Sequence, residues 1–165
     1  MIMPPQITLI SNFILFRNLG WLDTHLALIV PGALIYPLGI FLLRQFIKNI
    51  PKDFEEAAYL DGCNTWGVYW RIILPLTKPA LITIGILSFL QSWNAFLEPI
   101  IYLNSLNKFT VTILINFFNS QASMGAPKWH LLMAASTIAI IPTIFVFGLA
   151  QKYITRSVTL SGLKQ

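Results

Sequence analysis

A polar stripe interrupts one long apolar stretch and holds the side chains best suited to binding chemistry. Its members follow one another at spacings of three, three and four residues, the spacing of one helix face; they are Ser88, Gln91, Asn94 and Glu98. Gln91 and Asn94 are the better candidates for hydrogen bonding a hydroxylated solute, with Ser88 beside them; hydrogen bonds between helices are an equally good interpretation. At about 1.5 Å per residue, Glu98 lies about 28 Å beyond Pro79, so we place it at the outer mouth of a membrane and not in a proton relay.

Catalytic and metal-binding patterns are missing from the sequence. It has no G-x-x-x-x-G-K-[ST] phosphate loop, and its serines have no partnered base. His25 and His130 lie about a hundred residues apart, without carboxylates or cysteines at metal-ligand spacing, and Cys63 is the only cysteine. We therefore predict no enzyme activity, no metal and no cofactor in this chain.

The composition is that of a membrane protein. Of the 165 residues, 56% are hydrophobic and only 10% are charged, against about 25% charged in a soluble domain. The net charge of +5 comes from scattered Lys and Arg, which argues against nucleic-acid binding.

The apolar residues fall into blocks long enough to cross a bilayer, which takes about 20 residues. We predict one all-α membrane domain over residues 1–165, a helical bundle with four spans at about 2–17, 26–46, 79–103 and 130–152. Pro31, Pro37 and Pro142 interrupt these blocks, and such prolines favour a packed bundle over isolated anchors.

The distribution of Lys and Arg predicts the orientation of the chain. Eight lie on one side of the predicted spans: Arg44, Lys48, Lys52, Arg71, Lys78, Lys152, Arg156 and Lys164. Arg17, Lys108 and Lys128 lie on the other. The positive-inside rule then places both termini and the loop 49–78 in the cytoplasm.

The loop 49–78 reads as a helix–turn–helix. Pro51 suits the first turn of a helix, and Gly62 suits its left-handed end. Asn64 or Thr65 can cap a second helix, which Pro75 is predicted to end. On that second helix an apolar face is expected at the spacing i, i+3, i+4 and i+7, formed by Trp66, Tyr69, Trp70 and Ile73.

This loop resembles the EAA loop of bacterial ATP-binding-cassette (ABC) importer permeases. The match is E-A-A-x3-G-x9-I-x-L-P, from Glu56 through Gly62 to Pro75. The segments Pro5–Ile10, Leu38–Phe46, Ile50–Lys52 and Ser92–Asn94 with Phe96–Leu97 extend the resemblance to the carbohydrate, maltose-type branch. Such permeases usually have about six spans, so the chain resembles the C-terminal part of one.

The resemblance implies a permease subunit in the bacterial cytoplasmic membrane that moves a carbohydrate or polyol-type solute. Its partners would be an ATPase subunit dimer, which holds ATP and Mg²⁺, a companion permease subunit and an extracytoplasmic solute-binding protein. The outer segment Asn104–Trp129 is the candidate contact with the solute-binding protein, and a plain structured connector is an equally good interpretation of it. The residues expected to couple to the ATPase are Glu55, Glu56, Ala57, Ala58, Asp61, Gly62, Ile72, Leu74 and Pro75. An ordinary interfacial helix with a solvated acidic face is the plainer interpretation of the loop.

The shortness of the chain leaves a second function open. A truncated, non-transporting remnant or assembly partner would bind the ATPase without forming half a pore. A channel or proton-coupled carrier needs ionisable groups in the middle of the membrane, and the predicted spans offer none that convinces.

Overall fold

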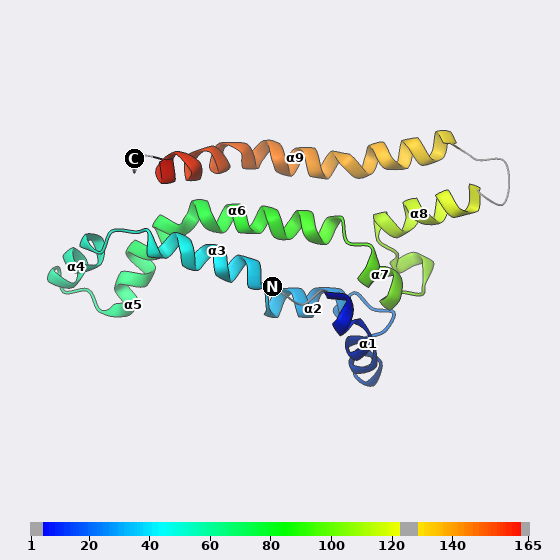
Figure 1. Ribbon diagram of the computed structural model, residues 1–165, viewed down its shortest axis with the longest axis horizontal. Helices are drawn as coiled ribbons and strands as arrows, with labels where there is room; N and C mark the ends of the chain where they lie inside the picture. Colours follow the sequence, from blue (N-terminus) through cyan, green and yellow to red (C-terminus); the bar gives the residue numbers. More distant parts are fainter. Residues whose placement is uncertain (1–4, 123–128, 163–165) are drawn as a thin grey trace. The chain divides into compact units, whose positions relative to one another are not determined.

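The computed structural model describes residues 5–122 and 129–162. Their secondary structure consists of helices joined by short turns, as predicted, and Figure 1 shows the helices in chain order. The chain divides into two compact units, each assembled from two separate stretches of sequence. The predicted positions of Lys128 and Lys164, and the start of the first predicted span, lie outside the described residues.

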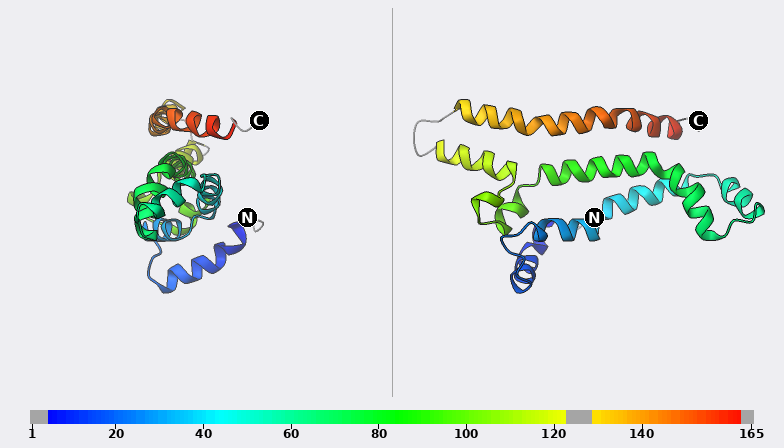
Figure 2. Two further views of the ribbon diagram at one scale, coloured as in Figure 1. Left: turned by 90° about the vertical axis from the view of Figure 1, so that its left-hand side faces the viewer. Right: turned by 180° about the vertical axis from the view of Figure 1, so that it is seen from behind.

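The first unit comprises residues 1–36 and 90–144. Its elements are a 3₁₀ turn, Pro5–Thr8, and the helices α1 (Leu9–Asn18), α2 (Leu26–Leu34), α7 (Leu97–Tyr102) and α8 (Val111–Ala122), with a second 3₁₀ turn at Leu106–Lys108. Phe16, Ala27 and Tyr102 form its core, so α1, α2 and α7 meet there (Figure 2). The Phe16 ring lies against Trp21 (5.9 Å between centroids) and edge-on to Tyr102 (5.1 Å), a geometry that adds to the area buried.

The second unit comprises residues 37–89 and 145–165. It contains α3 (Pro37–Lys48), α4 (Asp53–Leu60), α5 (Thr65–Val68) and a π turn, Tyr69–Ile73. Helix α6 (Leu74–Trp93) begins in this unit, and α9 (Trp129–Gly162) ends in it. The core of α4, α5 and the π turn consists of Ala58, Val68 and Ile73.

Three helical stretches within the described residues are long and apolar enough to cross a membrane: Leu26–Lys48, Thr65–Trp93 and Trp129–Leu149. They overlap the second, third and fourth predicted spans. The first predicted span holds α1, which has 10 residues, fewer than the roughly 17 that a span needs. The four-span arrangement therefore stays a prediction.

Prolines shape these helices in two ways. Pro31, Pro79 and Pro142 lie inside helices, as membrane helices tolerate. Pro37 begins α3 after a break at Ile35, whose backbone is extended, because a proline cannot donate the hydrogen bond that would continue α2.

Candidate functional site

Helix α4 ends in a Schellman turn at Gly62. The Gly62 N–H donates to the Tyr59 carbonyl and the Cys63 N–H donates to the Ala58 carbonyl, both at 3.0 Å, which is the hydrogen-bond pattern of this motif. The φ of Gly62 is +81°, a left-handed conformation that residues with a Cβ adopt only at a cost in energy. The predicted helix stop at Gly62 is confirmed.

The second helix begins at an Asn64 cap. Asn64 has an extended backbone (ψ 170°), and its Oδ1 accepts a hydrogen bond from the Gly67 N–H at 2.8 Å. A Cβ on Gly67 would lie 3.1 Å from that oxygen, so the glycine leaves room for the cap. Of the two capping candidates, the structure selects Asn64.

A π turn at Tyr69–Ile73 joins α5 to α6. The Leu74 N–H donates to the Tyr69 carbonyl, a bond that spans five residues and not four. Pro75 follows and has no N–H to donate to the Arg71 carbonyl, as an α-helix would require. The prediction that Pro75 ends the second helix is wrong, because the π turn takes up this mismatch and the helix continues through Pro75 into α6.

The π turn also divides the predicted apolar face. Residues five apart in an α-helix lie about 140° apart around the axis, but across this wider turn Val68 and Ile73 are both buried, against Ala58. Trp66 and Trp70 remain exposed. The prediction of a single face is therefore wrong for Ile73, which belongs to the core of the loop.

The nine residues predicted to couple to an ATPase differ in exposure. The exposed ones are Glu56, Ala57, Asp61, Gly62 and Pro75; Glu55, Ile72 and Leu74 are half-buried, and Ala58 is buried. Ala58 thus helps to pack α4 onto α5, whereas Ala57 beside it faces outward. Contact between these residues and an ATPase stays a prediction.

The predicted polar stripe does not lie on one helix. Ser88 and Gln91 are on α6, but α6 ends at Trp93 and Glu98 is on α7. The Asn94 side chain donates to the Leu90 carbonyl at 2.8 Å, beside the Asn94 N–H that donates to the same oxygen at 3.1 Å, so this amide folds back onto its own helix end. The expectation of one continuous stripe is corrected on this point.

Pro99 accounts for the break. A continuous helix would need the Pro99 nitrogen to donate to the Ala95 carbonyl, and proline has no N–H. In the structure the Thr112 hydroxyl donates to that carbonyl instead, at 2.7 Å. The end of α6 is held further by Trp93, whose indole N–H donates to the Ala139 carbonyl at 3.1 Å.

A shallow hollow of about 380 Å³, wide open to its surroundings, lies in the first unit. Its lining residues come from three segments: Phe96, Thr112, Ile115, Asn116, Asn119 and Leu132. Thr112, Asn116 and Asn119 follow one another at spacings of four and three residues along one face of α8. None of the three predicted pathway residues lines this hollow, and sequence reasoning did not select the amides of α8.

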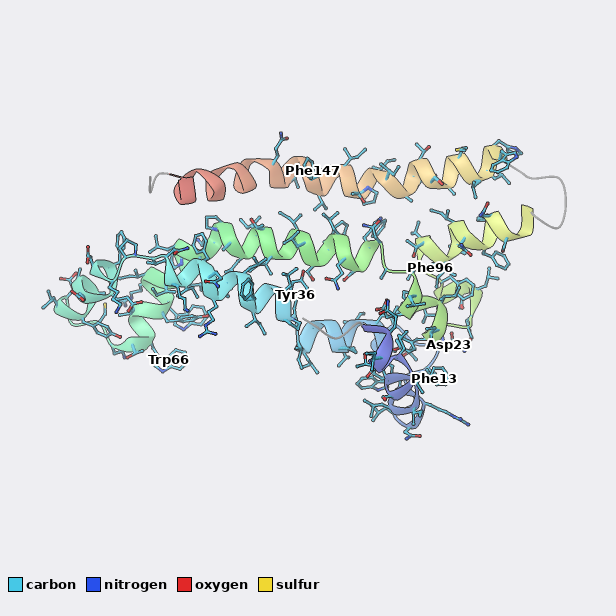
Figure 3. The ribbon with its side chains drawn as sticks, in the orientation of Figure 1. Phe13, Asp23, Tyr36, Trp66, Phe96 and Phe147 are labelled. Atoms are coloured by element: carbon cyan, nitrogen blue, oxygen red, sulfur yellow. The ribbon has the colours of Figure 1, made fainter. Side chains whose placement is uncertain are left out.

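Sequence reasoning also missed a polar cluster centred on Asp23, which Figure 3 labels. The Asp23 carboxylate accepts hydrogen bonds from the Asn104 N–H (2.9 Å), the Ser105 N–H (2.8 Å) and the Ser105 hydroxyl (2.5 Å), and it pairs with the Lys108 ammonium at 3.0 Å. The same ammonium donates to the Asp23 carbonyl at 2.6 Å, and His25 Nε2 lies 3.1 Å from the Lys108 carbonyl oxygen. The cluster ties the segment after α1 to the loop after α7.

The cluster fixes the charge of Asp23. Hydrogen bonds from the Ser105 hydroxyl and N–H, then from the Asn104 N–H and Lys108, hold the pKa of the Asp23 carboxyl well below its ordinary range. Asp23 also adopts a φ of +57°, which aspartate tolerates better than most residues. The sequence held one indication of this pair: Asp23 is the only acidic residue before Asp53, and Lys108 is the only charged residue between Glu98 and Lys128. Each is thus an isolated charge of opposite sign to the other.

The chain matches the family described as binding-protein-dependent transport system inner membrane component over residues 1–160. It is 34% identical over 164 residues to the arabinooligosaccharides transport system permease protein AraQ of Bacillus subtilis, which covers 99% of this chain and 57% of that protein. It is 36% identical over 162 residues to the trehalose/maltose transport system permease protein MalG of Thermococcus litoralis, covering 97% and 58%.

A solved structure is also similar. A chain of a bacterial ABC transporter involved in the import of the acidic polysaccharide alginate superposes with a TM-score of 0.71 at 28% identity, over 87% of this chain and 55% of that one. The present chain thus spans little more than half the length of the relatives it matches.

Proposed function

Since this chain belongs to the family of binding-protein-dependent transport system inner membrane components, we propose that it acts as a permease subunit of a bacterial ABC importer for carbohydrates. The observation that carries the proposal is the agreement between the relatives' names and the membrane-capable helices. Those names specify arabinooligosaccharides, trehalose and maltose, and the similar structure imports alginate. All are built from hydroxylated sugar units.

We further propose that the loop 49–78 couples transport to a separate ATPase dimer on the cytoplasmic side. Two features support this role. Local hydrogen bonds close the C-terminal end of α4 at Gly62 and the N-terminal end of α5 at Asn64. Ala58, Val68 and Ile73 give the loop its own core. A loop of this kind moves as a unit, and its helical run continues into a span without interruption. A push on α4 then reaches α6 through packed side chains, and the spans alternate between inward- and outward-open states.

The remaining partners follow from the same proposal. With both termini in the cytoplasm, the Asp23–Lys108 cluster lies on the outer side, where it braces the surface that meets the solute-binding protein. A companion permease supplies the other half of the passage. Ser88 and Gln91, together with Asn94 at the end of α6, stay candidates for contact with solute. The amides of Asn116 and Asn119 join them, because they line the hollow beside α8 and can hydrogen-bond a hydroxylated solute.

The test is to replace Gly62 in the tagged chain, expressed in cells that supply its ATPase. A Cβ at Gly62 meets no atom of the chain within 4 Å, so Gly62→Arg places its side chain outside the loop. We expect Gly62→Arg to abolish both co-purification of the ATPase and sugar uptake, and Gly62→Asn, which tolerates the left-handed backbone, to retain both.

Three results are decisive. Unchanged ATPase recovery and unchanged uptake with Gly62→Arg would refute the coupling role. Loss with Gly62→Arg but not with Gly62→Asn supports it. ATPase recovery by the unmodified chain without uptake of any sugar would refute transport by this chain and favour the assembly partner instead.

A further inference from the structure

Three aromatic side chains stand exposed on the second helix of the loop. The exposed fractions of Trp66, Tyr69 and Trp70 are 71%, 42% and 60%. Tyr69 meets the other two edge-on, with ring centroids 6.4 Å from Trp66 and 5.3 Å from Trp70. We call these three residues the aromatic face; in Figure 3 Trp66 points away from the helices of the loop. Exposed aromatic clusters of this kind indicate a contact surface.

The aromatic face lies at the start of a membrane-capable helix. The continuous run Thr65–Trp93 has 29 residues, about 43 Å at 1.5 Å per residue. The hydrocarbon core is about 30 Å thick, and the bilayer with its headgroups about 40–45 Å. The 20 residues of α6 are about 30 Å long, enough to cross the core. Each headgroup layer is about 5–7 Å deep. Trp70 precedes α6 by four residues, about 6 Å, which puts the nearer part of the aromatic face in this layer, and α5 turns steeply away from the axis of α6 in Figure 1.

The charges around the aromatic face suit that depth. Between Asp61 and Glu98 the only charged residues are Arg71 and Lys78, and both are exposed. Basic residues near the surface of an anionic leaflet are attracted to it. The acids of the loop lie instead in the first turn of α4, at Asp53, Glu55 and Glu56, and just after it at Asp61.

We infer that the aromatic face and Arg71 seat the loop in the headgroup layer of the membrane, while the acidic helix α4 projects into water. Trp and Tyr suit this layer because their rings are apolar and their N–H and O–H groups are polar. The loop then has two surfaces with different partners, lipid at α5 and the π turn and water or protein at α4. This inference needs only that the chain spans a membrane, and it is independent of any ATPase.

The test measures how deeply the tryptophans of the aromatic face sit. Replacing Trp21, Trp93 and Trp129 by Phe leaves Trp66 and Trp70 as the fluorophores. The full chain is reconstituted into phosphatidylcholine–phosphatidylglycerol vesicles whose acyl chains carry bromine either near the headgroup or near the chain end. We expect at least twofold stronger quenching by the shallow bromines than by the deep ones, and little quenching by aqueous iodide.

A matched control reports on the other surface. In a background with all five tryptophans replaced by Phe, Phe54→Trp places one indole on α4, where Phe54 is half exposed (49%). We expect iodide to quench this indole strongly and the shallow bromines to quench it weakly. The difference between the unmodified chain and its Trp66→Phe/Trp70→Phe variant repeats the measurement without the other substitutions.

Several outcomes would overturn the inference. Strong iodide quenching of Trp66 and Trp70 without bromine quenching would place the aromatic face in water. Equal lipid quenching of the Phe54→Trp indole would remove the distinction between the two surfaces. Relief of the bromine quenching when purified ATPase is added would show that the aromatic face is a protein contact.

Discussion

Replacing Gly62 by Ala measures how strongly the Schellman turn holds the loop. A Cβ at this position meets no atom within 4 Å, so the change acts only through the backbone, whose φ is +81°. A left-handed backbone costs a residue with a side chain about 1–2 kcal/mol, and the more restricted unfolded chain offsets about 0.4–1 kcal/mol of that cost. The net loss is about 1 kcal/mol, which opens the turn roughly fivefold more often.

Hydrogen exchange of the full chain in lipid nanodiscs reads out this loss. The amides at positions 62 and 63 close the turn, so their exchange is expected to quicken about fivefold with Gly62→Ala and by less with Gly62→Asn. Gly20→Ala is the matched control: Gly20 also has a positive φ (+68°) and open surroundings, but it lies in the other unit. Exchange at Cys63 that stays within twofold of the parent chain, or that quickens equally with Gly20→Ala, would refute the reasoning.

Two further predictions concern the packing of the loop and the charge of Asp23. Ala58→Leu overfills a buried position (3% exposed) and should lower the free energy of unfolding of the loop by about 1–3 kcal/mol. Ala57→Leu, on an exposed position, should change it by less than about 0.5 kcal/mol. Denaturant-dependent proteolysis of the loop measures both changes, and equal losses would contradict this packing. The pKa of Asp23 is lowered in the folded chain, so its cluster stabilises the chain above the ordinary Asp pKa of about 4 and loses that effect as the pH falls below it. Asp23→Asn should therefore lower the Tm at pH 7 and make the Tm less sensitive to acid below pH 4, and an unchanged pH profile would count against the cluster.

Local rules predicted where α4 ends and where α5 begins. Gly62 and Asn64 act within a few residues of themselves, and their preferences for a left-handed turn and a cap do not depend on distant parts of the chain. The amphipathic spacing from Trp66 to Ile73 was also visible, but its register was wrong. A π turn has no strong composition of its own, so the sequence pattern assumed 3.6 residues per turn throughout.

Distant contacts decided the rest. Pro99 indicates from the sequence alone that the polar stripe does not lie on one helix. The sequence does not indicate which group replaces its missing N–H, because Thr112, the donor to the Ala95 carbonyl, lies 17 residues away. Asp23 pairs with residues more than 80 positions along the chain, and a single sequence does not reveal such a pairing. The hollow beside α8 likewise exists only because three separate segments meet.

The π turn at Tyr69–Ile73 sets the angular phase between the loop and the span that follows it. Deleting one residue from this turn would remove its extra residue and rotate everything before it by about 100° relative to α6, with a shift of about 1.5 Å, while the carbonyl four residues before Pro75 would still lack a donor. Ala58 and Val68 would rotate together and Ile73 would leave the core of the loop, and the acidic side chains of α4 would point in a new direction around the axis of α6. One extra residue in a turn thus determines which way α4 faces relative to the helix that follows it.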